Sequence, residues 1–155
     1  MNIAILGAGN SGCALASDYA ARGHEVTLIK TSHSLHDDNF THLCATGGRM
    51  RIHDFGKETD CVIAHLSRDV ADVRAKDVVL LCTQTGYHPD VLRRVVPFLT
   101  PGQVLLVPEQ YSHEAERALC AACGDSLSLY AEVLSFTGLA RRVAAETGAG
   151  EAPLL

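Results

Sequence analysis

The stretch NIAILGAGNSGCALASDYAARGHEVTLI, residues 2–29, decides the fold of this chain. Its first residues, Asn2–Leu6, form an apolar run that a glycine ends, which predicts a short buried strand. A helix is predicted over Asn10–Arg22, and Glu25–Ile29 is predicted to be a second strand because it is rich in β-branched residues. A strand, a helix and a strand within about thirty residues have the size of a parallel crossover unit.

The rest of the chain continues the alternation of strands and helices. Further strands are predicted over Arg49–His53, Cys61–His65, Val78–Cys82, Gln103–Val107 and Leu127–Ala131. Helices are predicted over Arg68–Arg74, Pro89–Leu99 and Ser112–Ala122, whereas the polar, His-rich stretch Thr31–Gly48 is predicted to be irregular. This alternation predicts an α/β fold, in which a doubly wound, mostly parallel sheet carries helices on both faces.

The loop GAGNSG, residues 7–12, carries the G-x-G-x-x-G spacing between the first strand and the first helix. Gly7 permits a tight turn, Gly9 lets the backbone approach a pyrophosphate, and Gly12 allows close packing of helix on strand. The N–H groups and the dipole at the start of the helix attract an anion. We therefore predict a dinucleotide site of the Rossmann type; the alternative is a glycine turn that only connects two elements. The remaining predicted contacts in this loop are Ala8, Asn10 and Ser11.

Lys30 follows the second strand, at the point where NAD-binding chains carry an acid that accepts hydrogen bonds from the ribose. A carboxylate there repels a 2′-phosphate and a lysine attracts it, and Thr31 and Ser32 add two hydroxyl groups. These three residues favour NADP over NAD as the cofactor. In the alternative, Lys30 points to solvent and the site is indifferent or takes NAD.

A second group of candidates follows the strand predicted at 78–82. Cys82, Thr83 and Gln84 stand at its carboxyl end, where ligands of open α/β sheets bind. We predict that they line the pyrophosphate or the nicotinamide ribose, the alternative being an ordinary strand-to-helix loop. Glu109 and Gln110 follow the next strand in the same way.

Composition excludes several other classes of protein. The formal net charge of −5 argues against a general nucleic-acid binder. No run approaches the roughly 20 apolar residues that span a membrane, and the first apolar run lacks the basic region of a signal peptide. The six cysteines are therefore expected to be reduced thiols in a cytoplasmic protein.

Two further patterns are read as structural. Cys120 and Cys123 form a C-x-x-C that closes a predicted helix, whereas a redox pair opens one. His33, His36 and His42 share a loop with acidic residues but fit no metal-site spacing, so no metal is predicted.

Three passages resemble the N-terminal NAD(P)-binding domain of the octopine/nopaline (opine) dehydrogenase family. They are residues 2–29, residues 77–110 (DVVLLCTQTGYHPDVLRRVVPFLTPGQVLLVPEQ) and residues 129–142 (LYAEVLSFTGLARR). The first two are also similar to ketopantoate reductase and glycerol-3-phosphate dehydrogenase. In the third, the resemblance makes Glu132 a weaker candidate for a place near the nicotinamide.

The resemblance implies an NAD(P)-dependent oxidoreductase that condenses an amino acid or amine with a 2-oxo acid by hydride transfer. It also implies a second, helical domain that supplies the catalytic His–Asp pair. We expect this chain to hold the NAD(P)-binding domain over residues 1–140, and a tail over 141–155 that leads toward the absent domain. No catalytic residue is assigned, and a homo-oligomer is possible on this reading. The alternatives are a non-catalytic module that senses the dinucleotide and a ketopantoate-reductase-like oxidoreductase.

Overall fold

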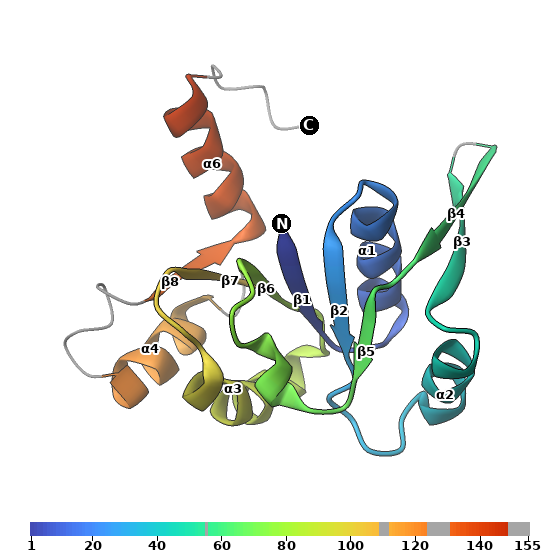
Figure 1. Ribbon diagram of the computed structural model, residues 1–155. Helices are drawn as coiled ribbons and strands as arrows, with labels where there is room; N and C mark the ends of the chain where they lie inside the picture. The colour runs from blue at the N-terminus through green and yellow to red at the C-terminus, as the bar shows by residue number, and fades with distance from the viewer. Residues whose placement is uncertain (55, 109–111, 124–130, 149–155) are drawn as a thin grey trace.

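The computed structural model describes residues 1–54, 56–108, 112–123 and 131–148, and its centre is one parallel sheet (Figure 1). Six strands stand in the order β5-β2-β1-β6-β7-β8, and every pairing between them is parallel. The strands are β1 (Asn2–Leu6), β2 (Glu25–Ile29), β5 (His65–Ser67), β6 (Val78–Leu81), β7 (Gln103–Val107) and β8 (Ala131–Ser135). The predicted α/β fold with a doubly wound parallel sheet is confirmed.

The order of the strands reverses between β1 and β6. Leu6, the last residue of β1, pairs with Ile29 of β2 on one side and Leu81 of β6 on the other. The loops that follow these three strands therefore leave the sheet side by side. Such a reversal is the place where open α/β sheets bind ligands.

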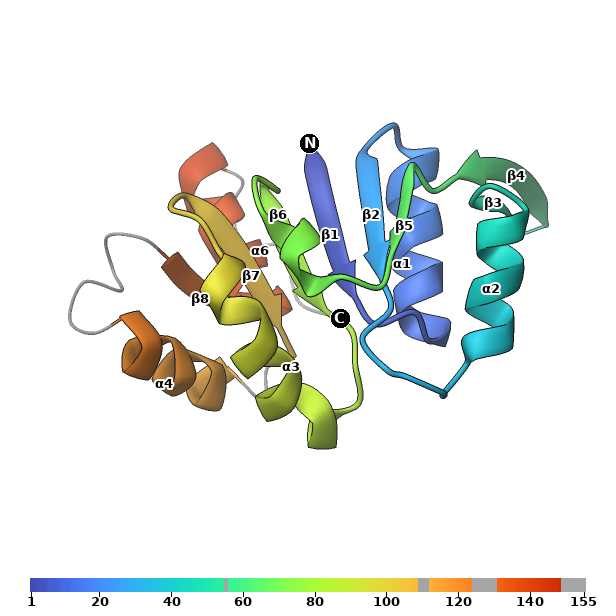
Figure 2. The ribbon, with the colours of Figure 1, turned by 60° about the horizontal axis from the view of Figure 1, so that its bottom comes forward.

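Helices cover both faces of this sheet (Figure 2). One face carries α1 (Asn10–Ala21) and α2 (Asp37–Ala45), and the other carries α3 (His88–Val95) and α4 (Ser112–Cys123). Successive residues of β1 alternate between two apolar clusters: Ile3 and Ile5 face α1, whereas Ala4 and Leu6 face α3. The central strands β1 and β6 are almost entirely apolar because both of their faces are buried.

Three short 3-10 turns lie in the connections between β5, β6 and β7. They are η1 (Val70–Val73), η2 (Thr85–Tyr87) and η3 (Val96–Phe98). The helix predicted over Arg68–Arg74 is only the turn η1, and the one predicted over Pro89–Leu99 is divided between α3 and η3. The second proline in that stretch, Pro97, cannot donate an intrahelical hydrogen bond, so α3 gives way to the 3-10 turn.

The segment predicted to be irregular contains a helix, so that prediction is wrong. Residues 37–45 form α2, which buries Phe40 and Leu43 against the α1 face of the sheet. These two residues stand three positions apart on one side of a helix whose other residues are mostly polar. A helix with so few apolar residues gives a weak periodic signal, and packing on the sheet stabilises it.

An antiparallel hairpin, β3 (Arg49–Asp54) with β4 (Lys57–Val62), follows α2. The two strands around Gly56 were predicted, but the second begins at Lys57 instead of Cys61. His65, expected to end that strand, begins β5 of the main sheet.

The last part of the sheet differs from the prediction. Most of the strand predicted over 127–131 lies outside the described residues, and β8 begins at its last position, Ala131. The helix α6 (Phe136–Thr147) then runs through the predicted domain boundary at residue 140, where the tail was expected to begin. The hydroxyl of Ser135 accepts a hydrogen bond of 3.0 Å from the Gly138 N–H and so caps this helix. The boundary between domains itself stays a prediction.

Among the described residues, no helix combines the length and the apolar character that crossing a bilayer requires.

Candidate functional site

A cavity of about 590 Å³ opens where β1, β2 and β6 end. It lies at the reversal of strand order, the position expected for a ligand in this kind of sheet. Its walls are formed by Gly7, Ala8, Gly9, Asn10, Ser11, Thr31, Ser32, His33, Ser34, Leu35, His36, Cys82, Thr83, Gln84, Tyr87, Asp90, Val91 and Arg94. Of the twelve predicted cofactor contacts, all except Gly12 and Lys30 are on these walls.

Each of the three glycine positions in the loop requires glycine for a different physical reason. Gly7 has a φ of +115°, and a Cβ there would lie 3.0 Å from the carbonyl oxygen of Cys82. A Cβ on Gly12 would lie 1.8 Å from the carbonyl oxygen of Gly7, so helix α1 approaches the end of β1 only with glycine at this position. A Cβ on Gly9 would have no described atom within 4 Å, because this residue borders the open cavity. Two glycines therefore build the turn, and the third keeps room for a ligand.

The start of helix α1 supplies hydrogen-bond donors to the same place. The first intrahelical bond of this end runs from the Cys13 N–H to the Gly9 carbonyl at 2.9 Å, and no side chain in the described ranges caps the helix. The amides of residues 10–12 therefore precede the intrahelical ladder. Asn10 and Ser11 line the cavity, so donors and the positive end of the helix dipole meet there, as an anion requires.

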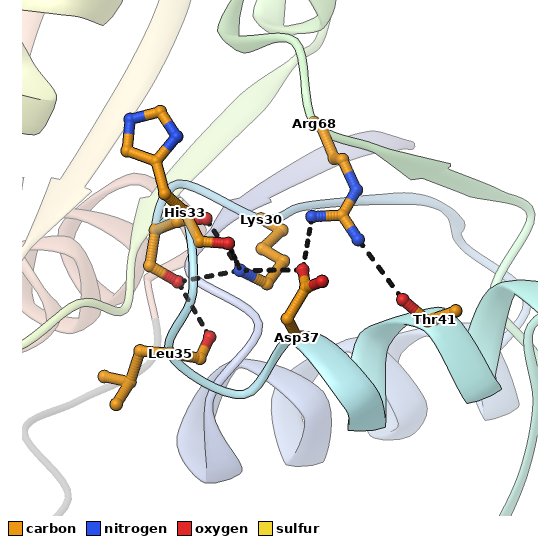
Figure 3. A network of polar contacts seen from close by, with 7 residues as sticks. Lys30, His33, Leu35, Asp37, Thr41 and Arg68 are labelled. Atoms are coloured by element: carbon orange, nitrogen blue, oxygen red, sulfur yellow. Dashed lines mark hydrogen bonds and ion pairs between the residues drawn. The ribbon is translucent and has the colours of Figure 1, made fainter.

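Lys30 stands at its predicted place after β2, but its ammonium group turns into the following loop (Figure 3). Nζ donates to the Ser32 carbonyl at 2.7 Å, to the Ser32 hydroxyl at 3.1 Å and to the His33 carbonyl at 3.2 Å. It also forms an ion pair of 3.4 Å with Asp37, and its side chain is only 1% exposed. The lysine that favoured NADP in the sequence is thus not on the cavity wall.

Asp37 extends this network toward the β5 edge of the sheet (Figure 3). Its Oδ1 accepts a hydrogen bond of 2.6 Å from Nη1 of Arg68, while Nη2 of Arg68 donates to Thr41 at 3.4 Å. The hydrogen bond from Arg68, with the charges of Arg68 and Lys30, lowers the pKa of the Asp37 carboxyl. The guanidinium also lies 5.1 Å from the centre of the Phe40 ring. These contacts fix helix α2 and the loop before it, which forms one wall of the cavity.

Arg94 is a site residue that sequence reasoning missed. It lies in the last turn of α3 and on the cavity wall, and its Nη1 donates to the carbonyl of Thr31 at 3.0 Å. Thr31 is separated from Arg94 by 63 positions, so no local pattern indicates this contact. The only sequence signal is the i,i+4 spacing of Asp90 and Arg94, whose charged groups are 3.8 Å apart.

The loop after β6 brings Cys82, Thr83 and Gln84 to the cavity, as predicted. His88 is fully buried behind this loop, and its Nε2 lies 2.8 Å from the carbonyl oxygen of Thr83. Burial raises the pKa of the Cys82 thiol to about 11. Cys82 is therefore a neutral wall of the site at physiological pH and not a nucleophile.

Other predicted candidates lie away from this cavity or outside the description. Glu109 and Gln110 are not among the described residues. Glu132 is in β8, where it pairs with Val104 of β7. Strand β7 therefore lies between Glu132 and β6, the strand that ends at the cavity. Within the described ranges, no group of three or more His, Cys, Asp or Glu residues is arranged to hold a metal ion. Cys120 is exposed near the end of α4, and it is one of five described cysteines that form no disulfide.

A glycine loop between β1 and α1, set over a cavity at the reversal of strand order, defines a dinucleotide-binding domain of the Rossmann type. The family model described as "NADP oxidoreductase coenzyme F420-dependent" matches residues 2–107, more than half of the chain. The chain belongs to this family, and it contains an NAD(P)-binding domain of an oxidoreductase.

Solved structures of dehydrogenases and reductases share the fold. A PanE/ApbA family ketopantoate reductase from Ralstonia eutropha JMP134 is 26% identical with a TM-score of 0.64, over 87% of this chain and 40% of that one. Octopine dehydrogenase in complex with NADH and agmatine is 18% identical with a TM-score of 0.67, over 87% of this chain and 34% of that one. The chain thus spans less than half of each relative. The predicted kinship with opine dehydrogenases and ketopantoate reductases is confirmed at the level of the fold.

The C-terminal part carries a different similarity. The model "ADDB, N-terminal" matches residues 99–155. A stretch of 61 residues is 41% identical to one component of the ATP-dependent helicase/deoxyribonuclease of Clostridium kluyveri (strain NBRC 12016), covering 39% of this chain and 5% of that protein. Residues 129–142 fall within the ADDB match and outside the oxidoreductase match. For this passage the resemblance to opine dehydrogenases, and with it the place of Glu132 near the nicotinamide, stays a prediction.

Proposed function

We propose that this chain binds NAD(P)(H) in the 590 Å³ cavity and forms the dinucleotide-binding half of an opine-type dehydrogenase. Such an enzyme condenses an amino acid or amine with a 2-oxo acid, and the bound nicotinamide supplies the hydride. The observation that carries the proposal is the open space at Gly9, next to the amides at the start of α1 that precede the helical ladder. That arrangement accepts a pyrophosphate without any movement of the backbone.

Each part of the cavity has a proposed role. The loop from Gly7 to Gly12 holds the pyrophosphate, and Thr31 and Ser32 bind the adenosine ribose. Cys82, Thr83 and Gln84 line the other side of the site, toward the nicotinamide. Lys30 and His88 act behind the walls, where their hydrogen bonds hold the two loops in place.

Titration of the chain with NADH and NADPH, followed by coenzyme fluorescence, tests the binding site. Gly9→Ala places a methyl group in the cavity. It is expected to lower the affinity for both coenzymes by about tenfold or more, since the backbone can no longer approach the pyrophosphate. Gly86→Ala is the matched control, because a Cβ there also meets no described atom within 4 Å and residue 86 is not on the cavity wall. Equal affinities in the two variants would contradict the proposed site.

The reaction is tested by following NADPH oxidation with different acceptors. An opine-type enzyme consumes NADPH only when an amino acid or amine accompanies the 2-oxo acid. The likeness to ketopantoate reductase supports the alternative of a reductase that needs no amine. Tight coenzyme binding without turnover of either kind, with the helical catalytic domain also present, would instead indicate a dinucleotide-sensing module.

A second candidate function concerns residues 99–155, because they match the model "ADDB, N-terminal", and 61 residues of the chain are 41% identical to a component of a helicase/deoxyribonuclease. On this proposal the stretch contributes to a DNA-processing protein, although the net charge of −5 argues against general DNA binding by the chain. Fluorescence anisotropy with a labelled duplex tests it. Binding that NADH does not compete would support the candidate, and no binding at low salt would count against it.

A further inference from the structure

Lys30 and Arg94 both lie beside the end of β2, and their charged groups make different contacts. We propose that Arg94, and not Lys30, discriminates between NADPH and NADH by contacting the phosphate on the adenosine ribose. This inference rests on the proposed function, since it names the residue that reads one group of the coenzyme.

Lys30 has no hydrogen-bond donor left for a ligand. An ammonium group carries three N–H donors, and the oxygens of Ser32 and His33 accept three hydrogen bonds from Nζ. Asp37 lies 3.4 Å from the same atom and balances its charge. A phosphate would have to displace several of these contacts to reach Nζ, so Lys30 is a positioning residue for the loop.

Arg94 has the opposite surroundings. A guanidinium group carries five N–H donors, and the carbonyl of Thr31 takes one of them. Its side chain is 36% exposed and stands on the cavity wall. The nearby carboxylate of Asp90 is 3.8 Å away and 64% exposed, so this ion pair is weak and easily exchanged for a stronger one.

The contact with Thr31 places this guanidinium group correctly for the role. Thr31 directly follows Lys30, at the end of β2, where dinucleotide sites bind the adenosine ribose. Holding on to the Thr31 carbonyl keeps the planar fork of Arg94 beside that position. A phosphate monoester accepts two parallel hydrogen bonds from such a fork, whereas a ribose hydroxyl gains little from it.

The test compares the dissociation constants of NADPH and NADH in four single variants of the full chain, three at positions 93 and 94 and one at Lys30. Arg94→Gln is expected to raise the dissociation constant of NADPH by about tenfold or more, while that of NADH changes by less than about twofold. Arg93→Gln is the matched control, because it removes the same charge from the same helix at a residue that is 73% exposed and off the cavity wall. Arg94→Lys keeps the charge without the fork and is expected to fall between the wild-type chain and Arg94→Gln.

The outcomes separate this inference from the proposed function. A wild-type chain that binds neither coenzyme would refute the proposed function. A wild-type chain that binds both equally, or an Arg94→Gln variant that weakens both by the same factor, would overturn the role of Arg94 alone. Lys30→Met is expected to weaken the binding of NADPH and NADH by the same factor. A folded Lys30→Met variant that loses affinity for NADPH alone would assign the discrimination to Lys30 instead.

Discussion

At the scale of single residues, the glycine loop shows how far a motif can be interpreted. The spacing of Gly7, Gly9 and Gly12 predicted a turn over a dinucleotide site, and the structure separates their roles. Position 12 needs glycine because it contacts the backbone of Gly7, and position 9 needs glycine because it borders the open cavity. Lys30 shows the limit of such reasoning, because its position was predicted but not the direction of its side chain. That direction depends on Asp37 and on the loop between them, which no spacing rule describes.

Substituting Gly12 by alanine is expected to destabilise the fold. The added Cβ would lie 1.8 Å from the carbonyl oxygen of Gly7, a backbone atom that moves only if the turn between β1 and α1 is rebuilt. We expect the free energy of unfolding to fall by about 3 kcal/mol, the upper range for overpacking, as measured by urea denaturation. Gly86→Ala serves as the control, and equal stability of the two variants would contradict the close packing of α1 on β1.

The network around Asp37 predicts a dependence of stability on pH. Because Arg68 and Lys30 lower the pKa of this carboxyl below its ordinary value of 3.8, folding favours the ionised form. Its contribution is complete above the ordinary pKa and is lost as the pH falls through the lower value of the folded chain. We expect the stability measured by denaturation between about pH 5 and pH 2 to fall less steeply in Asp37→Asn than in the wild type. Identical pH profiles would show that the ion pairs of Asp37 do not stabilise the fold.

At the scale of elements, the buried parts of the chain were the predictable ones. β1, β2 and β7 have the bounds that were predicted, because strands covered on both faces need mostly apolar residues, and such runs stand out in the sequence. Helix α2 was missed because only two of its residues, Phe40 and Leu43, are buried. Its position follows from long-range contacts, such as the one between Arg68 and Asp37, which are 31 positions apart.

Phe40→Ala tests whether α2 supports the ligand site. The ring is 3% exposed, and its removal is expected to cost about 3–4 kcal/mol of unfolding free energy. Since α2 anchors the loop of residues 31–36, we also expect weaker binding of NADH and NADPH, measured by titration at a temperature where the variant remains folded. Unchanged affinity would mean that the polar contacts of Lys30 and Asp37 hold this loop without the buried ring of Phe40.

At the scale of the whole molecule, two family models match different parts of one sheet. The oxidoreductase family model ends at residue 107 and the ADDB model begins at residue 99, so both include β7. All the described residues that line the cavity stand at or before residue 94. The site and the C-terminal similarity are thus carried by different parts of one sheet.

Leu119→Ala, in α4, is the matched control for Phe40→Ala in the part of the chain that does not line the cavity. Leu119 is 1% exposed, so its truncation is expected to lower the free energy of unfolding by about 3 kcal/mol, as in Phe40→Ala. Its effect on coenzyme affinity is expected to be absent, because no described residue beyond 94 touches the cavity. A loss of affinity equal to that of Phe40→Ala would show that the site depends on the stability of the entire domain.

The shared strand β7 has a consequence for how such chains can arise. A parallel sheet grows at its edge by one strand and one helix at a time, and each addition needs only the hydrogen-bonding edge and the apolar face of the strand before it. In this chain β8 meets β7 in that way, from Gln103 opposite Ala131 to Val107 opposite Ser135. A recombination point within β7 can therefore join coding segments of separate ancestry without altering the four strands β5, β2, β1 and β6, three of which end at the cavity.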